Sequence, residues 1–198
     1  MKSAKGFSLI ELLIASSVGL IAIGIVGSVF LSGYKMTNQR SLELLLEQDV
    51  SDAFRLIKED ILRAGYVSSG TNSLRLYQGN GVSLADNIIY TEDGCLGYTY
   101  QDNEGVQQYN VFYLDGNLIR YKSVSSSVTT DEICNISNAY SLLYQEQILV
   151  TKFEVESKSI SSASATSQLI SIKLAAEIKN NSVVSTAKSI QIKTRNWQ

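Results

Sequence analysis

An uncharged, apolar run from Leu12 to Leu31 is the sequence feature that most limits what this chain can fold into. Apart from Ser and Gly, its residues are aliphatic or aromatic. As an α-helix, about 20 residues rise roughly 30 Å, which is the thickness of the hydrocarbon core of a bilayer. Lys2 and Lys5 precede the run, and positive residues favour the cytoplasmic side of a membrane. We therefore expect one membrane span, with the N-terminus in the cytoplasm and everything after Leu31 outside it.

A single carboxylate, Glu11, stands directly before this run. A charge in a membrane span is costly and usually has a function. A cleaved secretory signal would have a shorter apolar region followed by small residues at its cleavage site, and residues 29–32 make a poor site. A plain single-span anchor explains the length of the run but neither Glu11 nor the junction of Gly6 and Phe7. Both interpretations remain alternatives to the one that follows.

The string Lys5-Gly-Phe-Ser-Leu-Ile-Glu-Leu12 resembles the leader junction of type IV prepilins and of their pseudopilin relatives. The resemblance implies that a dedicated membrane peptidase on the cytoplasmic side cuts between Gly6 and Phe7. It also implies that the new amino group of Phe7 is N-methylated. Cleavage there removes the basic leader but keeps the apolar helix, which can then serve as a membrane anchor and as a packing element inside a filament.

In the core of such a filament, Glu11 would be a buried carboxylate, and an unpaired buried charge is strongly destabilising. The resemblance implies that its partner is the ammonium group of Phe7 in a neighbouring subunit. A subunit placed one register out would leave both charges unpaired. We therefore expect this pair to select the register and the order in which subunits are added.

Composition narrows the possible functions. The chain has 198 residues, a formal net charge of −2 and no His. Without a basic surplus, direct nucleic-acid binding is not expected. Without His, the chain has no His-based catalytic triad, no His-ligated metal and no use of the commonest general base. We expect no enzymatic activity and no cofactor, and residues 32–198 suffice for one domain of ordinary size.

Cys95 and Cys134 are the two cysteines of the chain. In an oxidising periplasmic or surface location, they are expected to form one disulfide. Closing a loop of about 40 residues would stabilise the fold by roughly 4 kcal/mol on the chain-entropy model. Two buried free thiols are the alternative, and a metal site based on two cysteines lacks further suitable ligands.

The helical pattern continues beyond the apolar run. Apolar residues recur at spacings of three and four between residues 42 and 64, with charged residues between them. This pattern predicts an amphipathic helix with one face to bury. Gly65 is a suitable residue to end it. We therefore predict one helix from Phe7 to Ala64, apolar all round in its first half and amphipathic in its second.

From Leu74 onward, apolar and polar residues alternate with a period of two, which predicts short strands. Asp115-Gly116 stands between two such runs and is a strong hairpin signal. Residues 123–130 and 159–167 are rich in Ser and are predicted to be loops. The predicted strands are residues 74–77, 87–91, 96–101, 108–114, 117–123, 147–157, 170–178 and 183–194.

Together these patterns predict an α+β fold, with a long N-terminal α-helix packed on a C-terminal antiparallel β-sheet, as in the type IV pilin fold. We divide the chain into a leader peptide (1–6), a transmembrane and filament-core helix (7–31), an amphipathic continuation of that helix (32–65) and a β-rich periplasmic or extracellular domain (66–198).

The chain shows no catalytic constellation. The adjacent carboxylates of Glu59-Asp60 and Asp131-Glu132 are expected to be solvated surface or cap residues. Residues 102–105 offer oxygen ligands that could hold calcium, but they lack the full EF-hand pattern, and a hairpin turn fits them better. Seven tyrosines in the sheet region are expected in the core, with an exposed adhesive patch as the alternative. They are Tyr98, Tyr100, Tyr109, Tyr113, Tyr121, Tyr140 and Tyr144.

A second resemblance concerns the kind of pilin. Residues 55–66 are similar to the end of the long helix in PilW-type minor pilins, as are residues 95–98 and the hairpin of residues 109–121. The resemblance implies a low-abundance pilin that primes filament assembly, sits in a tip complex and supports motility, attachment or DNA uptake. Cys134 lies far from the C-terminus, unlike the C-terminal cysteine of major pilins. The alternatives are a minor pseudopilin of a type II secretion system and a pilus-borne adhesin.

The same resemblance implies the partners and the location of the protein. The partners are other minor and major pilins through the N-terminal helix, the prepilin peptidase and the inner-membrane assembly platform. Before assembly, the protein would span the inner membrane once, with its C-terminal domain in the periplasm. After assembly, it would lie in the pilus at the cell surface.

Overall fold

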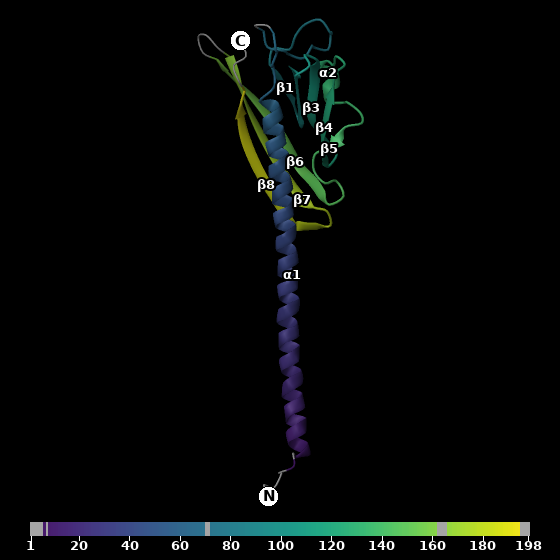
Figure 1. Ribbon diagram of the computed structural model, residues 1–198, viewed down its shortest axis with the longest axis vertical. Helices are drawn as coiled ribbons and strands as arrows, with labels where there is room; N and C mark the ends of the chain where they lie inside the picture. The colour runs from purple at the N-terminus through teal and green to yellow at the C-terminus, as the bar shows by residue number, and fades with distance from the viewer. Residues whose placement is uncertain (1–5, 7, 70–71, 162–165, 195–198) are drawn as a thin grey trace. The chain divides into compact units, whose positions relative to one another are not determined.

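One long helix, α1 (Leu9–Ile61, 53 residues), begins the fold. The structure is a computed structural model that describes residue 6 and residues 8–69, 72–161 and 166–194 (Figure 1). The chain divides into two compact units, residues 1–42 and 43–198. Within the described residues, α1 is the one helix long and apolar enough to cross a membrane. The predicted α+β class is confirmed, because α1 is followed by antiparallel sheets.

In the first unit, the Ser hydroxyls of the apolar run bond to the backbone of α1 itself. The hydroxyls of Ser16, Ser17 and Ser28 each donate a hydrogen bond to the carbonyl oxygen three residues earlier, at 2.8–3.0 Å. Such local bonds leave no hydroxyl donor to be solvated. The Ser residues of the apolar run are therefore compatible with a surrounding that contains no water.

In the second unit, α1 buries one face. The buried residues are Leu46, Val50, Ala53, Phe54, Ile57 and Ile61. Burying one large apolar side chain stabilises a fold by about 1.5–3 kcal/mol, so this face is a main source of stability. The helix ends at Ile61 and not at Ala64, because residues 62–65 form a turn. Gly65 adopts the left-handed φ of 79° there, and its N–H donates to the carbonyl of Thr99.

The first sheet is an antiparallel meander in the order β1-β2-β3-β4-β5. Hairpin β3–β4 turns at Gly116-Asn117, as Asp115-Gly116 predicts, with Gly116 at a φ of 59°. A short helix, α2 (Thr130–Ile133), lies between β4 and β5 in the chain. The strands are β1 (Ile89–Glu92), β2 (Cys95–Gln101), β3 (Gln107–Asp115), β4 (Leu118–Val124) and β5 (Tyr140–Ser141).

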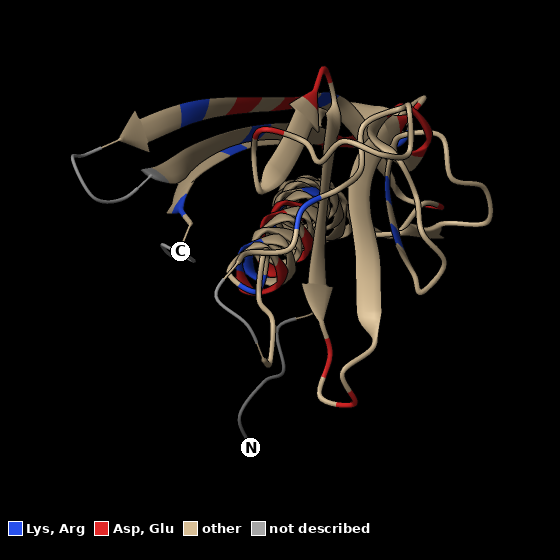
Figure 2. Ribbon diagram, turned by 90° about the horizontal axis from the view of Figure 1, so that it is seen from above, with Lys and Arg blue, Asp and Glu red and all other residues tan. Residues whose placement is uncertain are grey.

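The second sheet is antiparallel in the order β6-β7-β8. Its strands are β6 (Ile148–Ser161), β7 (Thr166–Ile178) and β8 (Asn181–Lys193). On its solvent face, Lys152, Glu154 and Lys173 form ion pairs. Figure 2 shows alternating basic (blue) and acidic (red) bands on this sheet. The hydrogen bond from Lys152, the largest of several causes, lowers the pKa of Glu154. The opposite face carries Ile170, Ile172 and other buried side chains.

Gln168 of β7 joins the two sheets. Its side chain is 3% exposed. Its Oε1 accepts a hydrogen bond from the N–H of Ile89 at 2.9 Å, and its Nε2 donates to the carbonyl of Ile89 at 3.0 Å. The side-chain amide therefore pairs with β1 as the backbone of a neighbouring strand would.

Asn117 makes a second link between the sheets. Its Nδ2 donates to the carbonyl of Val150 at 3.1 Å, and its own carbonyl accepts from the N–H of Val150 at 2.9 Å. The pairing of β6 with β7 shifts register between Val150 and Lys152. Strand β6 is at the edge of its sheet, so backbone groups on its outer side are open to pairing, and Asn117 in the turn of the β3–β4 hairpin pairs with those of Val150.

The structure differs from the sequence prediction in the number of sheets. We predict one sheet, and the structure has two. Alternation shows which face of a strand is buried, but it does not determine which strand lies beside it. Segment 74–77 is not a strand and makes only isolated bridges at Tyr77. Leu76 is nevertheless fully buried, so the alternation there reflects burial without ladder pairing.

The predicted loop at residues 159–167 is also wrong at both of its ends. Strand β6 continues to Ser161 and β7 begins at Thr166, while residues 162–165 lie outside the described part of the chain. Ser167 and Gln168 are buried, and their bonds to Thr194 satisfy the Ser167 hydroxyl and the Gln168 N–H. Strand β5 and helix α2 were not predicted. Thr129 is the N-cap residue of α2, and its N–H and hydroxyl donate to Glu132, which therefore takes part in the cap, as the sequence allowed.

Replacing Gln168 with Ala should lower the free energy of unfolding by about 1–3 kcal/mol, because a buried N–H and a buried carbonyl of Ile89 lose their partner. Denaturant unfolding of the full chain in detergent measures this. Gln191→Ala, at an exposed position of β8, is the matched control and should stay within about 0.5 kcal/mol of the unchanged protein. Equal stability of the two variants would show that the amide of Gln168 does not hold the sheets together.

Candidate functional site

The N-terminal junction consists of Gly6, Phe7 and the first turn of α1. Gly6 is exposed, and Phe7 lies outside the described residues. The structure therefore leaves the expected cleavage and methylation as predictions. It does show how the helix begins, at Leu9, with Glu11 in its first turn.

Glu11 caps its own helix. The backbone N–H of Ser8 donates to Glu11 Oε2 at 3.0 Å, and the carbonyl of Ser8 accepts the N–H of Leu12 at 3.2 Å. Ser8 thus precedes the first helical residue and Glu11 is the third, and the bond from the Ser8 N–H is one of the two bonds of a capping box. A carboxylate there also interacts favourably with the positive end of the helix dipole. The sequence Ser8-Leu-Ile-Glu11 carries this signature, and our sequence reasoning, which looked only for an intermolecular partner, missed it.

The apolar surface that follows is continuous. Every large apolar side chain from Leu9 to Leu31 exposes between 58% and 77% of its surface within the described structure. A shallow apolar groove on this part of α1 is lined by Ala22, Ile23, Val26, Gly27 and Phe30. Apolar surface on this scale has to be covered by lipid or by other protein. The apolar part of α1 in the first unit therefore requires lipid or another protein to cover it.

A cluster of tyrosines surrounds Asp60 near the end of α1. The hydroxyl of Tyr98 donates a hydrogen bond to Asp60 Oδ2, and the hydroxyls of Tyr100 and Tyr121 lie 3.4 and 3.5 Å from the carboxylate. Arg63 Nη1 lies 3.6 Å from Asp60 Oδ1. The prediction that Asp60 is a solvated surface residue is wrong, since its side chain is 13% exposed. It lies at the border of the buried helix face, beside Ile61.

The cluster shifts the acidity of its tyrosines. Burial, followed by the nearby charge of Asp60, raises the pKa of Tyr98 well above its usual value. The same two causes, in the same order, raise the pKa of Tyr100 and Tyr121. The hydroxyls therefore stay protonated and donate to the carboxylate. This arrangement holds the end of α1 on β2 and β4.

Replacing Asp60 with Ala should lower the free energy of unfolding by about 1–3 kcal/mol at neutral pH, because the buried hydroxyl of Tyr98 loses its acceptor. Denaturant unfolding of the full chain in detergent again gives the difference. Glu59→Ala removes the neighbouring carboxylate, which is exposed, and should change the stability by no more than about 0.5 kcal/mol. If Asp60→Ala were as mild as Glu59→Ala, the tyrosine cluster would not depend on Asp60.

Cys95 and Cys134 form a disulfide, with their Cα atoms 5.9 Å apart. It joins the start of β2 to the residue after α2. Gly97 allows this close packing, because a Cβ atom there would lie 2.8 Å from Ile133 Cγ1. The disulfide thus fixes α2 against the first sheet.

Residues 102–105 form the turn between β2 and β3. Asp102 Oδ1 accepts the N–H groups of Glu104 and Val106 at 3.0 and 2.9 Å, and Oδ2 accepts the side-chain amide of Gln108 at 2.8 Å. The bond from Gln108, followed by that from Val106, lowers the pKa of Asp102. The carboxylate is used inside the turn, as the hairpin interpretation predicts. Among the described residues, no group of three or more His, Cys, Asp or Glu is arranged to hold a metal ion.

The other tyrosines divide between core and surface. Tyr109 is buried, and Tyr113 is half-buried with its hydroxyl donating to the carbonyl of Ile136 at 2.6 Å. Tyr140 and Tyr144 are 74% and 55% exposed, so the prediction of a core position is wrong for these two. Both lie in or just after the short strand β5, which the alternation pattern did not reveal.

Comparison with protein-family models gives two matches. Residues 39–194 match the family described as prepilin peptidase-dependent protein B. Residues 1–27 match the prokaryotic N-terminal methylation motif, and this range contains Gly6, Phe7 and Glu11. Neither the curated proteins nor the solved structures gave a match. The first match covers more than half of the chain and includes both sheets, while the second covers the junction and most of the apolar run.

Proposed function

We propose that this chain, which belongs to the prepilin peptidase-dependent protein B family, is a minor pilin that primes assembly of a type IV pilus from a tip complex. The chain is a type IV prepilin-like protein. One observation carries the proposal: the two family matches both include part of the same continuous helix, α1. This helix is apolar in its first part and packed on sheets in its second. This design suits a subunit that leaves a membrane and enters a filament.

In this proposal, the peptidase cuts between Gly6 and Phe7, and Phe7 is then N-methylated. Residues 7–31 form the membrane and filament-core helix, residues 32–65 continue it, and residues 66–198 form the periplasmic and later extracellular domain. The partners are other minor and major pilins and the inner-membrane assembly platform. The role is structural and supports motility, attachment or DNA uptake, and the likeness to PilW-type minor pilins is part of the proposal.

Deleting the gene tests the function. Electron microscopy counts the surface filaments, and secreted protein is measured in the same cultures, with the full-length gene restored as a control. A priming minor pilin predicts loss or strong reduction of filaments, with secretion unchanged. Normal filaments with blocked secretion would contradict the proposal and assign the protein to the pseudopilus of a type II secretion system.

Two replacements of Glu11 separate its capping role from the proposed pairing with the Phe7 ammonium group. Glu11→Gln keeps an oxygen that can accept the N–H of Ser8 but removes the charge, whereas Glu11→Ala removes both. Immunoblots of sheared filaments and of membranes measure incorporation. If the charge pair directs assembly, both variants stay processed in the membrane, and their incorporation falls by about tenfold or more.

Incorporation of Glu11→Gln at the normal level, with loss only for Glu11→Ala, would contradict charge pairing. It would show instead that the capping bond to Ser8 is what the helix requires. Ser8→Ala, which keeps the backbone N–H, is the control and should assemble normally.

A further inference from the structure

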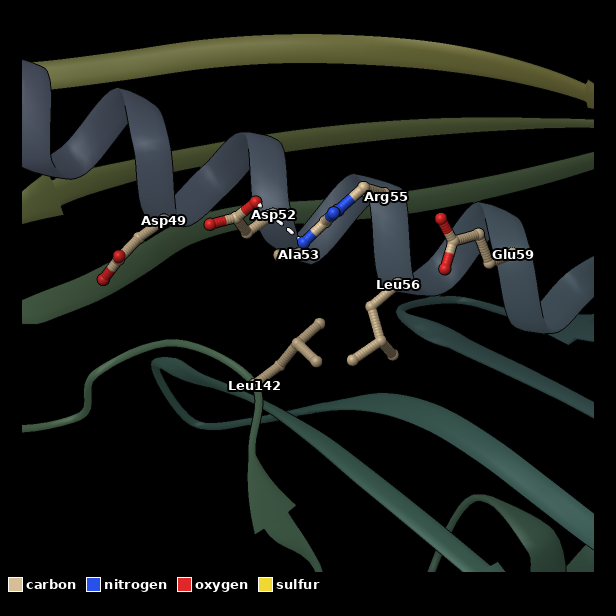
Figure 3. A pocket seen from close by; sticks show the side chains of 7 residues that line it. All are labelled: Asp49, Asp52, Ala53, Arg55, Leu56, Glu59 and Leu142. Carbon is tan, nitrogen blue, oxygen red and sulfur yellow. Dashed lines mark ion pairs between the residues drawn. The ribbon is translucent and has the colours of Figure 1, made fainter.

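A groove runs along α1 on the solvent side of its buried face, wholly inside the second unit of the chain. It consists of two adjoining pockets of about 390 and 320 Å³, which share Leu56 and Glu59. Figure 3 shows the larger pocket, with Leu142 reaching from the segment after β5 toward Leu56. We call this surface the helix groove and define it by Asp49, Asp52, Leu56, Glu59, Arg63 and Leu142.

The positions that α1 contributes to the helix groove follow a helix-packing pattern. Residues 49, 52, 56, 59 and 63 are spaced by three and four. This spacing places the five side chains in one stripe along α1, where a second helix lying alongside would meet them in turn. The stripe is distinct from the buried face, whose residues contact the sheets. Leu56 is the one apolar residue of the stripe and stands at its centre, between charged residues on both sides.

The floor of the helix groove is apolar and held in place. Leu56 exposes 43% of its surface, although it lies in a packed part of the fold. Leu142 is half-buried, and its N–H donates to the carbonyl of Ile119 at 2.8 Å. The two side chains face each other across the pocket (Figure 3). A partner's aliphatic side chain placed between them would be desolvated on both sides, which is how central interface residues gain their binding energy.

The rim of the helix groove is acidic and only partly neutralised. Asp52 pairs with Arg55 at 3.3 Å, and both are exposed, so this pair contributes little. Asp49 and Glu59 make no ion pair or hydrogen bond with any residue that the structure describes. Burial, followed by the charge of Asp52, raises the pKa of Asp49. A cation brought to this carboxylate would therefore be favourable.

We propose that the helix groove binds an α-helix of a different, neighbouring pilin subunit, one that carries two Lys or Arg residues about three turns apart with a large aliphatic residue between them. Asp49 and Glu59 are ten residues apart, or about 15 Å along α1, and this separation sets the spacing of the two cations. The inference rests on the proposed role in a filament and adds to it the chemistry of one contact.

A second copy of this chain is a poor occupant. Between residues 43 and 61, α1 carries six acidic and only two basic residues. The acidic ones are Glu43, Glu47, Asp49, Asp52, Glu59 and Asp60, and the basic ones are Arg55 and Lys58. Two such stretches laid side by side would bring carboxylates together, and like charges across an interface are unfavourable. The helix groove thus selects for a more basic partner.

Photo-crosslinking in living cells tests the proposal. A photoreactive amino acid replaces Leu56 in the full-length protein, and each of the other prepilin-like subunits of the cell is co-expressed with it in turn. The control site is Val183 of β8, which is 79% exposed and lies outside the helix groove. Mass spectrometry of the crosslinked peptide identifies the partner segment. The expected result is a crosslink from residue 56, absent from residue 183, to a helical segment with the stated basic and aliphatic pattern.

Charge-reversal variants provide a second test in the same crosslinking experiment. Glu59→Lys should lower the yield of this crosslink about tenfold, and reversing the facing Lys or Arg of the partner to Glu should restore it. Glu104→Lys makes the same charge change in the β2–β3 turn and should leave the yield unchanged. Crosslinks only to a second copy, a partner segment that is not helical, or equal yields for Glu59→Lys and Glu104→Lys would overturn the proposal. Filament counts in the deletion strain test the minor-pilin role separately. The helix contact would exist in a type IV pilus and also in the pseudopilus of a type II secretion system, so the two proposals can fail independently.

Discussion

Helix α1 has to satisfy two surroundings at once, and the rest of the fold depends on how it does so. From residue 12 to residue 31, it carries no charge, and the chain has no Pro to interrupt it. Further along, the same helix presents a single apolar face to the sheets. A helix with apolar residues all round requires lipid or other helices, whereas an amphipathic helix requires one packed partner. The sheets supply that partner for residues 46–61.

The attachment of α1 to the sheets is specific because polar contacts surround the apolar face. Lys188 of β8 donates to Ser51 Oγ at 2.9 Å, and three tyrosine hydroxyls of the first sheet meet Asp60. Apolar burial alone tolerates small rotations of a helix, but satisfied polar groups do not, since a buried donor without an acceptor is destabilising. The solvent face that remains, with the helix groove, is therefore held in a fixed orientation to the sheets. A fixed surface of this kind can distinguish one neighbouring helix from another.

The sequence predicted those parts of the fold that depend on patterns among neighbouring residues. The long helix, the β3–β4 hairpin and the alternating strand at residues 170–178 all follow from periodicity and turn residues. The division into two sheets could not, because it depends on Gln168 and Asn117 pairing with backbone groups far away in the chain. Asp60 was misjudged for the same reason, since its three tyrosine partners lie at least 38 residues away. The Ser8–Glu11 cap was predictable, because its signature is four residues long.

The central claim is that the mature protein begins at Phe7, after removal of residues 1–6, and that the amino group of Phe7 is methylated. Mass spectrometry of the N-terminal peptide, from protein purified out of cells with an active prepilin peptidase, tests it most directly. The account predicts a peptide that begins at N-methylated Phe7 and lacks residues 1–6. A chain that still begins at Met1, or one cut near residues 29–32, would contradict it and would make the apolar run a plain anchor or an ordinary secretory signal.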